Sequence, residues 1–382
     1  MFTVNPGFRD WGPTTIAGTT IIGGNSSGRG GLFAVDTVTG KLKWSLRPTG
    51  LFHGSPFVAT RPAVIGGTVV VPMGNTLVAV SLATGREMWR GIRTAQGATV
   101  AADADTAYVL GDDNYFYAFN AATGRQKWKI AFSEGIGSCT SHPVVRDNTV
   151  YVSGNVLLRA ADANRPAAHY RHLFALDTNT GAERWRYPSK PTSAADRGIC
   201  VSQPIAAENA FFAVDDKTLY AIDRTNGREL WKLEVRRPVE GRERAVSVSG
   251  LVDAGSVLIG VSSSYLIAFD KASGRTVWEI PGQYSGSSPS TAVAGRVLYF
   301  QGHPGAPPAA EIQGRILYVD GKPVAEAPAL PPGKLNALDL DTRKILWSFS
   351  RPTAEANWAF GFVTPVDGGL WVDSYQALVK LQ

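Results

Sequence analysis

The feature that most constrains this fold is a short segment that the chain repeats from end to end. The first copy, Leu32 to Trp44, contains the pattern Ala-x-Asp-x-x-Thr-Gly-x-x-x-Trp. Six further copies run from Ala79 to Trp89, Ala118 to Trp128, Ala175 to Trp185, Ala221 to Trp231, Ala268 to Trp278 and Ala337 to Trp347. Near-regular recurrence of this kind predicts a solenoid or a propeller, and it overrides the two or three domains that a length of 382 residues would otherwise suggest.

Each copy predicts a strand, a tight turn and a second strand. Alternating apolar residues such as Leu32 to Val35 are typical of a buried strand. In the turn, Asp and Thr oxygens accept nearby backbone N–H groups, and Gly adopts a positive φ without steric cost. Two more apolar strands precede each copy, for example Ala63 to Ile65 and Thr68 to Val71. The repeating unit is therefore a four-stranded antiparallel sheet.

Stacking these sheets predicts the architecture. One such sheet cannot bury both faces alone, and radial stacking of four-stranded units gives a β-propeller, with each motif Trp wedged between neighbouring blades. Residues 375–381 match only the third strand of a unit, while Phe2 to Pro6 aligns with Trp44 to Pro48 and supplies a fourth. We therefore predict an all-β, eight-bladed propeller of four-stranded antiparallel blades. It forms a single domain, 1–382, whose ring is closed by the N-terminal strand completing the last blade.

One face of this propeller is predicted to be elaborate. The connections from the fourth strand to the next blade, and from the second strand to the third, lie on the same face. They include two insertions, at about 154–171 in blade four and about 302–334 in blade seven. The second is rich in Pro and Ala, and we interpret it as a hairpin or flap. Long loops in a compact domain are typically functional or disordered, so we expect the functional site on this face.

All five histidines fall in these connections: His53, His142, His169, His172 and His303. His142 opens a first strand and is the best single candidate for an acid/base or hydrogen-bonding role. His169 and His172 have a spacing that metal ligands use, but no carboxylate or Cys stands at a matching distance, so no metal site is predicted.

Aromatic residues outside the motif gather in the same loops. Trp11 and Trp358 flank the last blade, with Phe360 nearby and Tyr284 one blade back. They suit either a ligand platform at a funnel mouth or packing beneath the second insertion, and both interpretations stay open. The complete set of candidate binding residues is Trp11, His53, Cys139, His142, Arg159, His169, His172, Gln203, Tyr284, His303, Trp358 and Phe360.

The two cysteines occupy equivalent places in neighbouring blades. Cys139 and Cys200 each stand four residues before the proline of a first strand. A disulfide, which would imply an oxidising compartment, and two free thiols are both compatible with this register. No haem-attachment motif and no phosphate-binding Gly loop is present in the sequence, and no Gly-x-Ser-x-Gly pattern stands in the strand-to-helix context of a nucleophile elbow.

Charge and hydropathy restrict the partners. The formal net charge of +6 favours anionic partners. The Arg-rich run from Arg236 to Arg244 contains two Glu and is typical of a solvated loop, so we expect no nucleic acid. No apolar run has the roughly 18 residues of a membrane span. Because Phe2 already belongs to a blade, a leader would have to precede Met1. We expect export to the envelope, the periplasm or the medium in that case, a cytoplasmic location otherwise, and a monomer.

With the repeats aligned, the chain resembles the PQQ-like (pyrroloquinoline-quinone-type) eight-bladed propeller superfamily over essentially its whole length. That superfamily includes quinoprotein dehydrogenases, the outer-membrane-assembly lipoprotein and sensor domains. The dehydrogenases carry an adjacent pair of cysteines beneath the quinone, and this sequence has none. The resemblance therefore implies no quinone cofactor. By size the chain is similar to the assembly-factor and sensor branch, whose members are single propellers without a catalytic centre.

Two functions remain in view. The first is a non-catalytic module that holds a peptide, a protein or a small ligand, anions included, on the His- and aromatic-rich face. The alternative is an enzyme acting on a small aromatic or anionic substrate at the funnel mouth. There, His142 or His53 would act as acid/base, Arg side chains would hold charge, and Trp11 and Trp358 would stack on the substrate.

Overall fold

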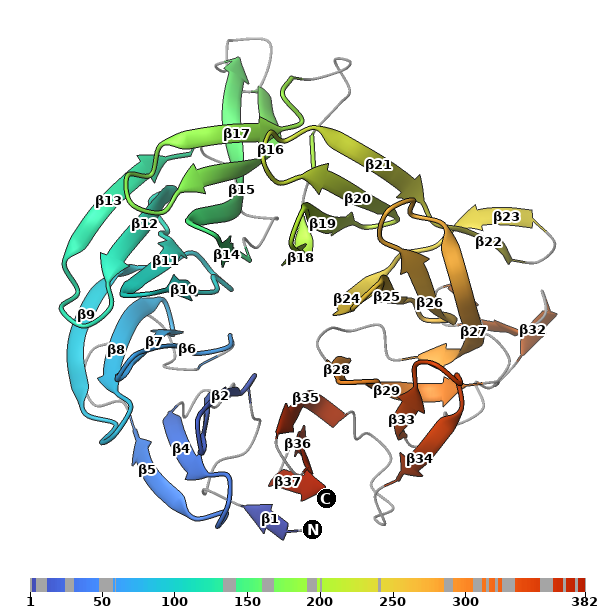
Figure 1. The fold of residues 1–382 in the computed structure, drawn as a ribbon, viewed down its shortest axis with the longest axis horizontal. Helices are drawn as coiled ribbons and strands as arrows, with labels where there is room; N and C mark the ends of the chain where they lie inside the picture. Colours follow the sequence, from blue (N-terminus) through green and yellow to red (C-terminus); the bar gives the residue numbers. More distant parts are fainter. Residues whose placement is uncertain are drawn as a thin grey trace. The chain divides into compact units, whose positions relative to one another are not determined.

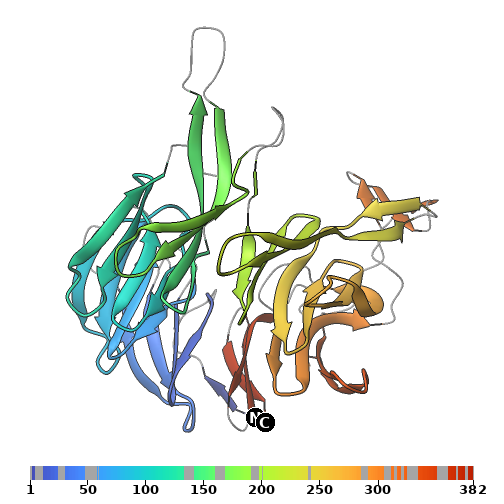
Figure 2. The ribbon, with the colours of Figure 1, turned by 45° about the horizontal axis from the view of Figure 1, so that its top comes forward.

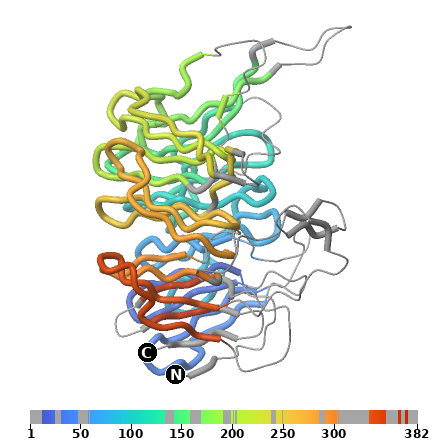
Figure 3. The backbone as a smooth tube through the Cα atoms, turned by 90° about the vertical axis from the view of Figure 1, so that its right-hand side faces the viewer, coloured from blue at the N-terminus to red at the C-terminus, as the bar shows by residue number. Residues whose placement is uncertain are grey.

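The structure is a computed structural model in which strands and turns form all of the described chain, without a helix (Figure 3). The described residues are 2–4, 12–24, 31–47, 58, 60–132, 142–159, 168–190, 198–199, 201–239, 242–284, 291–304, 311–313, 316–319, 322–324, 334–350, 360–366, 369–374 and 377–381. The chain forms two compact units. Unit 1 comprises Met1–Phe211, Ile222–Arg228 and Gln376–Val379, and unit 2 comprises Phe212–Ala221, Glu229–Tyr375 and Lys380–Gln382.

Unit 1 contains four antiparallel sheets of four strands, each in chain order (Figure 1). The first is β2 (Thr15–Ala17), β3 (Thr20–Gly24), β4 (Leu32–Asp36) and β5 (Leu42–Leu46). The second is β6 (Ala63–Ile65), β7 (Thr68–Met73), β8 (Thr76–Ser81) and β9 (Glu87–Arg93). The third is β10 (Ala101–Asp103), β11 (Thr106–Leu110), β12 (Tyr115–Asn120) and β13 (Gln126–Ala131). The fourth is β14 (Val144–Arg146), β15 (Thr149–Arg159), β16 (Ala168–Asp177) and β17 (Glu183–Tyr187).

The fourth sheet of unit 1 has an extended central hairpin. The ladder between β15 and β16 runs from Thr149↔Asp177 to Arg159↔Ala168, far past the ends of β14 and β17 (Figure 2). The inserted sequence in this unit is therefore a continuation of two strands for as far as the chain is described.

Unit 2 contains two further four-stranded blades. One is β24 (Ser249–Ala254), β25 (Val257–Val261), β26 (Tyr265–Asp270) and β27 (Thr276–Tyr284). The other is β28 (Ala292–Ala294), β29 (Val297–Pro304), β33 (Leu335–Asp339) and β34 (Ile345–Phe349). The end of β27 also pairs with the end of β29, in the register Gly282↔Pro304 to Tyr284↔Gly302, so backbone hydrogen bonds join these two blades into one sheet.

Smaller elements complete unit 2. They are the hairpin β22 (Arg236–Val239) with β23 (Arg242–Ala245), the three-stranded sheet β30 (Glu311–Gln313), β31 (Ile316–Val319) and β32 (Lys322–Val324), and the antiparallel pair β35 (Phe360–Val366) and β36 (Gly369–Ser374). The sheet β30–β32 occupies the insertion for which the sequence predicted a hairpin or flap.

The remaining strands are β18 (Ser202–Ala206), β19 (Ala210–Asp215), β20 (Thr218–Asp223) and β21 (Glu229–Glu234), which follow each other in one four-stranded sheet, together with β1 (Phe2–Val4) and β37 (Ala377–Leu381). The repeated four-stranded antiparallel sheets confirm the all-β prediction. The count of eight blades, the closure of a ring by the N-terminal strand and the single domain stay predictions.

The motif turn folds as its sequence predicts. In the first copy, Asp36 Oδ1 accepts the backbone N–H groups of Val38 and Thr39, at 3.0 and 2.8 Å, and the Thr39 hydroxyl. Gly40 closes the turn at φ 69°. Hydrogen bonding to the Thr39 backbone lowers the pKa of Asp36 to about 2, because these donors favour the ionised carboxylate. The turn is thereby fixed by groups that the motif itself supplies.

The motif tryptophans join neighbouring sheets, as predicted. Trp44 in β5 donates its indole N–H to the carbonyl of Leu82, at 2.8 Å, in the turn of the next sheet. The same bond joins Trp89 to Ala121, Trp128 to Thr178, Trp185 to Arg224 and Trp231 to Lys271. In every case the acceptor is the residue after the motif Asp position, and the Gly three residues later lies against the indole ring.

The core lies between the sheets, around these tryptophans. In one cluster of unit 1, Ile22 and Leu32 of one sheet pack with Val69, Val71 and Val78 of the next, all fully buried. Full burial of each such side chain contributes roughly 1.5–3 kcal/mol relative to exposure.

We predict that Gly85→Ala destabilises the protein by about 1–3 kcal/mol more than Gly66→Ala. Both glycines lie in turns of one sheet at positive φ, 68° and 57°, so both substitutions carry a similar backbone cost. A Cβ on Gly85 would lie 2.5 Å from Cε3 of Trp44, whereas a Cβ on Gly66 has no neighbour within 4 Å. The additional cost is therefore that of displacing the indole. Urea unfolding of both variants measures the difference, and equal destabilisation would contradict the proposed role of the Trp–Gly contact.

Candidate functional site

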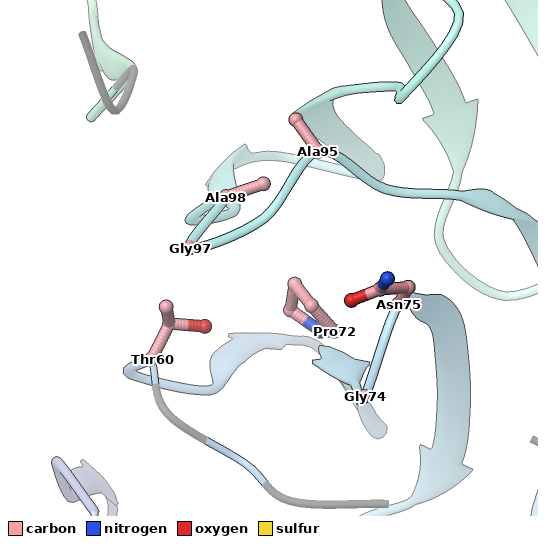
Figure 4. A pocket seen from close by; sticks show the side chains of 7 residues that line it. All are labelled: Thr60, Pro72, Gly74, Asn75, Ala95, Gly97 and Ala98. Atoms are coloured by element: carbon pink, nitrogen blue, oxygen red, sulfur yellow. The ribbon is translucent and has the colours of Figure 1, made fainter. Parts of the chain in front are cut away.

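The described part of unit 1 contains a small pocket between the connections of two neighbouring sheets (Figure 4). Its walls come from the segment before β6, the turn between β7 and β8, and the loop between β9 and β10. It is lined by Thr60, Pro72, Gly74, Asn75, Ala95, Gly97 and Ala98. Its volume of about 10 Å³ is close to that of one water molecule.

Backbone hydrogen bonds hold the walls of the pocket in place. Thr94 N–H donates to the carbonyl of Asn75, at 2.9 Å, and so joins the two loops. Ala95 N–H donates to the Leu110 carbonyl, at 3.0 Å. Gly97, at φ 71°, lets the chain turn back so that Ala98 N–H reaches the Ala95 carbonyl, at 3.1 Å. The pocket is thus set by main-chain geometry and small side chains.

One buried hydroxyl gives the pocket its chemistry. Thr60 lines the pocket, and its buried Oγ1 has no hydrogen-bond partner among the residues that the structure describes. The buried Oγ1 of Thr94, whose neighbour Ala95 lines the pocket, also has no partner among these residues. Figure 4 shows the Thr60 hydroxyl directed toward the pocket. A buried hydroxyl without a partner costs about 1–3 kcal/mol, so the Thr60 hydroxyl has the capacity to hydrogen-bond a small polar group that enters the pocket. Sequence reasoning missed these residues, since neither hydroxyl stands in a motif.

His172 has a structural environment in β16. It is 3 % exposed, and its Nδ1 lies 2.5 Å from the Pro188 carbonyl oxygen, to which an Nδ1–H donates. Its ring meets Tyr170 and Phe174 edge-on, with centroids at 4.9 and 5.5 Å. Burial lowers the pKa of His172, opposed by the hydrogen bond to Pro188.

His169 lies on the same strand and is half-buried. Residues three apart on a strand point to opposite faces, so His169 and His172 do not share one metal ion despite their spacing. Among the residues that the structure describes, no three His, Cys, Asp or Glu side chains gather in a way that would hold a metal.

Tyr284 packs in the core of unit 2. It is 6 % exposed, its hydroxyl donates to the Ile280 carbonyl at 3.0 Å, and its ring lies 5.8 Å from that of Phe300. Burial raises its pKa. Tyr284 is thus a core residue of unit 2, and the two interpretations of the other aromatic residues stay open. His303 lies beside Tyr284 in β29, where its backbone is paired with Gln283 of β27.

The other candidates are placed only in part. His142 is half-buried just before β14, in unit 1. Arg159, Gln203 and Phe360 lie in β15, β18 and β35, and the structure describes their backbone alone. Trp11, His53, Cys139 and Trp358 lie outside the described residues, as does Cys200, so the question of a disulfide stays open. No catalytic constellation is assembled among the described candidates.

The repeated sheets and the docked tryptophans define the class of this protein, a β-propeller built from PQQ-type repeats. The family profile of the outer membrane protein assembly factor BamB matches residues 5–99 and 74–348, and the chain belongs to that family. Among the residues that the structure describes, no helix has the length and apolarity that a bilayer crossing requires.

Solved structures share this fold. The chain is similar to BamB from Moraxella catarrhalis, with a TM-score of 0.52 and 18 % identity over 75 % of this chain and 79 % of that one. It is also similar to the quinohemoprotein alcohol dehydrogenase ADHIIG from Pseudomonas putida HK5, with a TM-score of 0.59 and 14 % identity over 97 % of this chain and 70 % of that one. At these identities the likeness concerns the fold alone.

Two curated relatives match parts of the chain. A tetrathionate hydrolase from Acidithiobacillus ferrooxidans is 30 % identical over 141 residues, which is 34 % of this chain and 26 % of that protein. The serine/threonine-protein kinase AfsK from Streptomyces coelicolor is 26 % identical over 178 residues, 46 % of this chain and 19 % of the kinase. The match therefore spans about a quarter or less of either relative.

We predict that His172 makes the protein less stable as the pH falls from 8 to 5. The unfolded chain takes up a proton at His172 near pH 6.5, whereas the folded chain does so only at lower pH, so protonation favours unfolding in this range. Glu183 and Arg186 face this ring with opposite effects on its pKa. The measurement is chemical unfolding of wild type, His172→Gln and His169→Gln as a function of pH. His172→Gln should have a flatter profile than the other two, and three parallel profiles would contradict the prediction.

A second prediction concerns the pocket. Thr60→Val replaces a buried hydroxyl, which has no partner among the described residues, by a methyl group of the same shape. It should leave stability unchanged or raise it by about 1 kcal/mol. Thr106→Val is the matched control. Its hydroxyl donates to Asp105 and accepts from Lys127, so the loss should be about 1 kcal/mol. Urea unfolding distinguishes them. A Thr60→Val variant as destabilised as Thr106→Val would show that the Thr60 hydroxyl is already bonded.

Proposed function

We propose that this protein is an exported, protein-binding propeller that holds a partner on the face formed by its fourth-to-first and second-to-third connections. Membership of the BamB family supports a scaffold role in the assembly of envelope proteins. The proposed role is non-catalytic, and the proposed partner is a folded or extended protein segment.

One observation carries this proposal. Every inserted β element in the described chain lies in those two kinds of connection. The extension of β15–β16 and the sheet β30–β32 follow second strands, and the hairpin β22–β23 follows the fourth strand β21. The motif turns, in contrast, repeat one geometry, with the Asp side chain accepting from the backbone in Asp36, Asp177, Asp223, Asp270 and Asp339. A scaffold that varies on one side only is suited to partner recognition there.

The chemistry of these connections suits a protein partner. Leu157 on the β15 extension is 47 % exposed. On the hairpin, Arg236 pairs with Glu234 and Arg237 with Glu279 of β27, so its cations are already partly neutralised. Apolar contacts with a polar rim are typical of protein interfaces, whereas a small-molecule site requires a larger closed cavity than the 10 Å³ pocket.

The enzyme alternative is favoured by one specific observation, the 30 % identity to a tetrathionate hydrolase over a third of the chain. In that case His142 or His53 would act as acid/base on a small anion. A small anionic substrate would then raise the melting temperature of the wild type by mass action, but not that of His142→Ala.

Site-specific photo-crosslinking in the native host tests the proposal. A photoreactive residue replaces Gln96 or Leu157 in the proposed binding connections, or Val38 in a motif turn as a control. Val38 is 67 % exposed and also apolar, so it matches Leu157 in chemistry. We expect Gln96 and Leu157 to give cross-links to the same protein and Val38 to give none. Equal cross-linking from Val38, or none from the other two positions, would contradict the proposed face.

A further inference from the structure

The outer strand β34 differs from its counterparts in every other blade where the motif strand is described. Three consecutive large apolar side chains are exposed on it, Ile345 at 38 %, Leu346 at 53 % and Trp347 at 39 %. The ring of Trp347 lies near the ring of Tyr299, and the two ring centroids are 6.0 Å apart. Exposed apolar side chains normally occur singly, so three in a row indicate a surface that another molecule covers.

The comparison with the sibling strands is direct. Each of β5, β9, β13, β17, β21 and β27 carries at least one Lys, Arg, Asp or Glu, whereas β34, Ile345–Phe349, carries none. Among the described strands β34 pairs only with β33, so it is an edge. Charged side chains on edge strands prevent pairing with foreign strands, and β34 lacks this protection.

The position before the motif Trp is variable. It holds a single exposed apolar residue in β9, β21 and β27, namely Met88, Leu230 and Val277, and a cation in three other strands. Lys43 and Lys127 occupy it in β5 and β13, where they pair with Asp36 and Asp105 at 3.3 and 2.5 Å. Arg184 occupies it in β17 and pairs with Asp177. Leu346 occupies it in β34. The fold therefore accepts a cation at this position, and the leucine is not required for folding.

Charge defines the end of the surface. Arg343 and Lys344 stand immediately before β34, both are exposed, and no carboxylate among the described residues pairs with either side chain. An extended segment that adds to β34 in antiparallel direction has its C-terminal end beside these cations. A carboxylate at that end would form charge-assisted hydrogen bonds with them.

We propose that β34 is a docking edge for an extended, apolar partner segment, which adds as an antiparallel strand and places a carboxylate at its C-terminal end beside Arg343 and Lys344. The five residues of β34 match a segment of about five or six residues, roughly 17 Å long. Main-chain hydrogen bonds supply the affinity, and alternate apolar side chains of the segment contact Leu346 or Trp347.

A second copy of the chain fits this edge less well. Antiparallel self-pairing would bring Arg343 and Lys344 of one copy toward Phe349 and Ser350 of the other, which carry no carboxylate. Parallel self-pairing would bring Arg343 and Lys344 against themselves. Neither arrangement supplies a carboxylate to these cations, and the parallel one opposes like charges, whereas a segment ending in a carboxylate complements them.

The test is a titration of the intact protein with a labelled hexapeptide, Ser-Ile-Thr-Val-Thr-Phe with a free C-terminal carboxylate, followed by fluorescence anisotropy. We expect saturable binding. Amidation of the C-terminus should weaken it about tenfold, and N-methylation of alternate peptide bonds should abolish it, because the main-chain donors are lost. Neither result depends on the folding of a variant.

Variants locate the site. Leu346→Lys should weaken binding of the hexapeptide at least about tenfold. Val277→Lys, at the equivalent and equally exposed position of β27, should leave it within about twofold. If Leu346→Lys does not fold, Leu346→Arg takes its place, because Arg184 supplies an arginine at this position in β17. A melting temperature equal to that of the wild type verifies that each variant is folded.

Three outcomes would overturn the proposal. They are equal binding of the amidated or N-methylated peptide, an effect of Val277→Lys as large as that of Leu346→Lys, and a concentration-dependent dimer of the protein that Leu346→Lys dissociates. The last would assign the edge to a second copy. Cross-linking from Gln96 and Leu157 does not involve β34, so the failure of this proposal and the failure of the proposed function are distinguishable.

Discussion

The contact between one motif tryptophan and the turn of the next sheet is the interaction on which the rest of this structure depends. A four-stranded sheet cannot bury both of its apolar faces alone, and the indole supplies both the apolar area and one directional hydrogen bond that join it to its neighbour. This hydrogen bond fixes the position of each sheet relative to the next, because its acceptor is the carbonyl of the residue after the motif Asp position. The bond from Trp128 to Thr178 is an example. The glycine that follows leaves room for the ring, since a Cβ at Gly181 would lie 2.8 Å from Cε3 of Trp128. The motif Asp, Gly and Trp thus all contribute to the same contact between neighbouring sheets, which explains why they recur together.

This dependence explains how much of the fold could be predicted from sequence. The strands, the turns and the role of the tryptophans follow from the motif, because its residues act through local hydrogen bonds and through a neighbour at a fixed sequence interval. Contacts particular to one pair of sheets do not follow. Arg224, whose side chain is 7 % exposed, donates to the carbonyls of Ala207 and Glu208, to the Tyr151 hydroxyl and to Asp147. It stands at a variable motif position, and nothing in its sequence context distinguishes it from an exposed arginine.

The candidate site was less accessible to sequence reasoning, for physical reasons that differ between residues. His172 and Tyr284 belong to loops or strand extensions where polar rings suggest ligand contact, yet both are buried and hydrogen-bonded to carbonyls of their own unit. The burial of such residues depends on contacts with parts of the chain that are distant in sequence. A local sequence pattern does not predict these contacts. Thr60 and Thr94 present the opposite case. They are ordinary threonines in sequence, and only the folded chain shows that their hydroxyls are buried without a partner among the described residues.

The places where the repeat departs from its rule are the most informative about function. Arg343 replaces the turn glycine in the blade of β34, and it adopts the left-handed φ of 59° that glycine would adopt without cost. The same blade has the motif Trp with 39 % exposure, where the corresponding Trp44, Trp128 and Trp185 are 8 % exposed. A chain under selection for stability alone would restore the glycine and place a charge on the edge strand, as its own sibling blades do. This blade instead combines a strained cation with an uncharged apolar edge. Such a combination is expected of a recognition surface, because residues that contact a partner cannot also be optimised for the stability of the isolated fold.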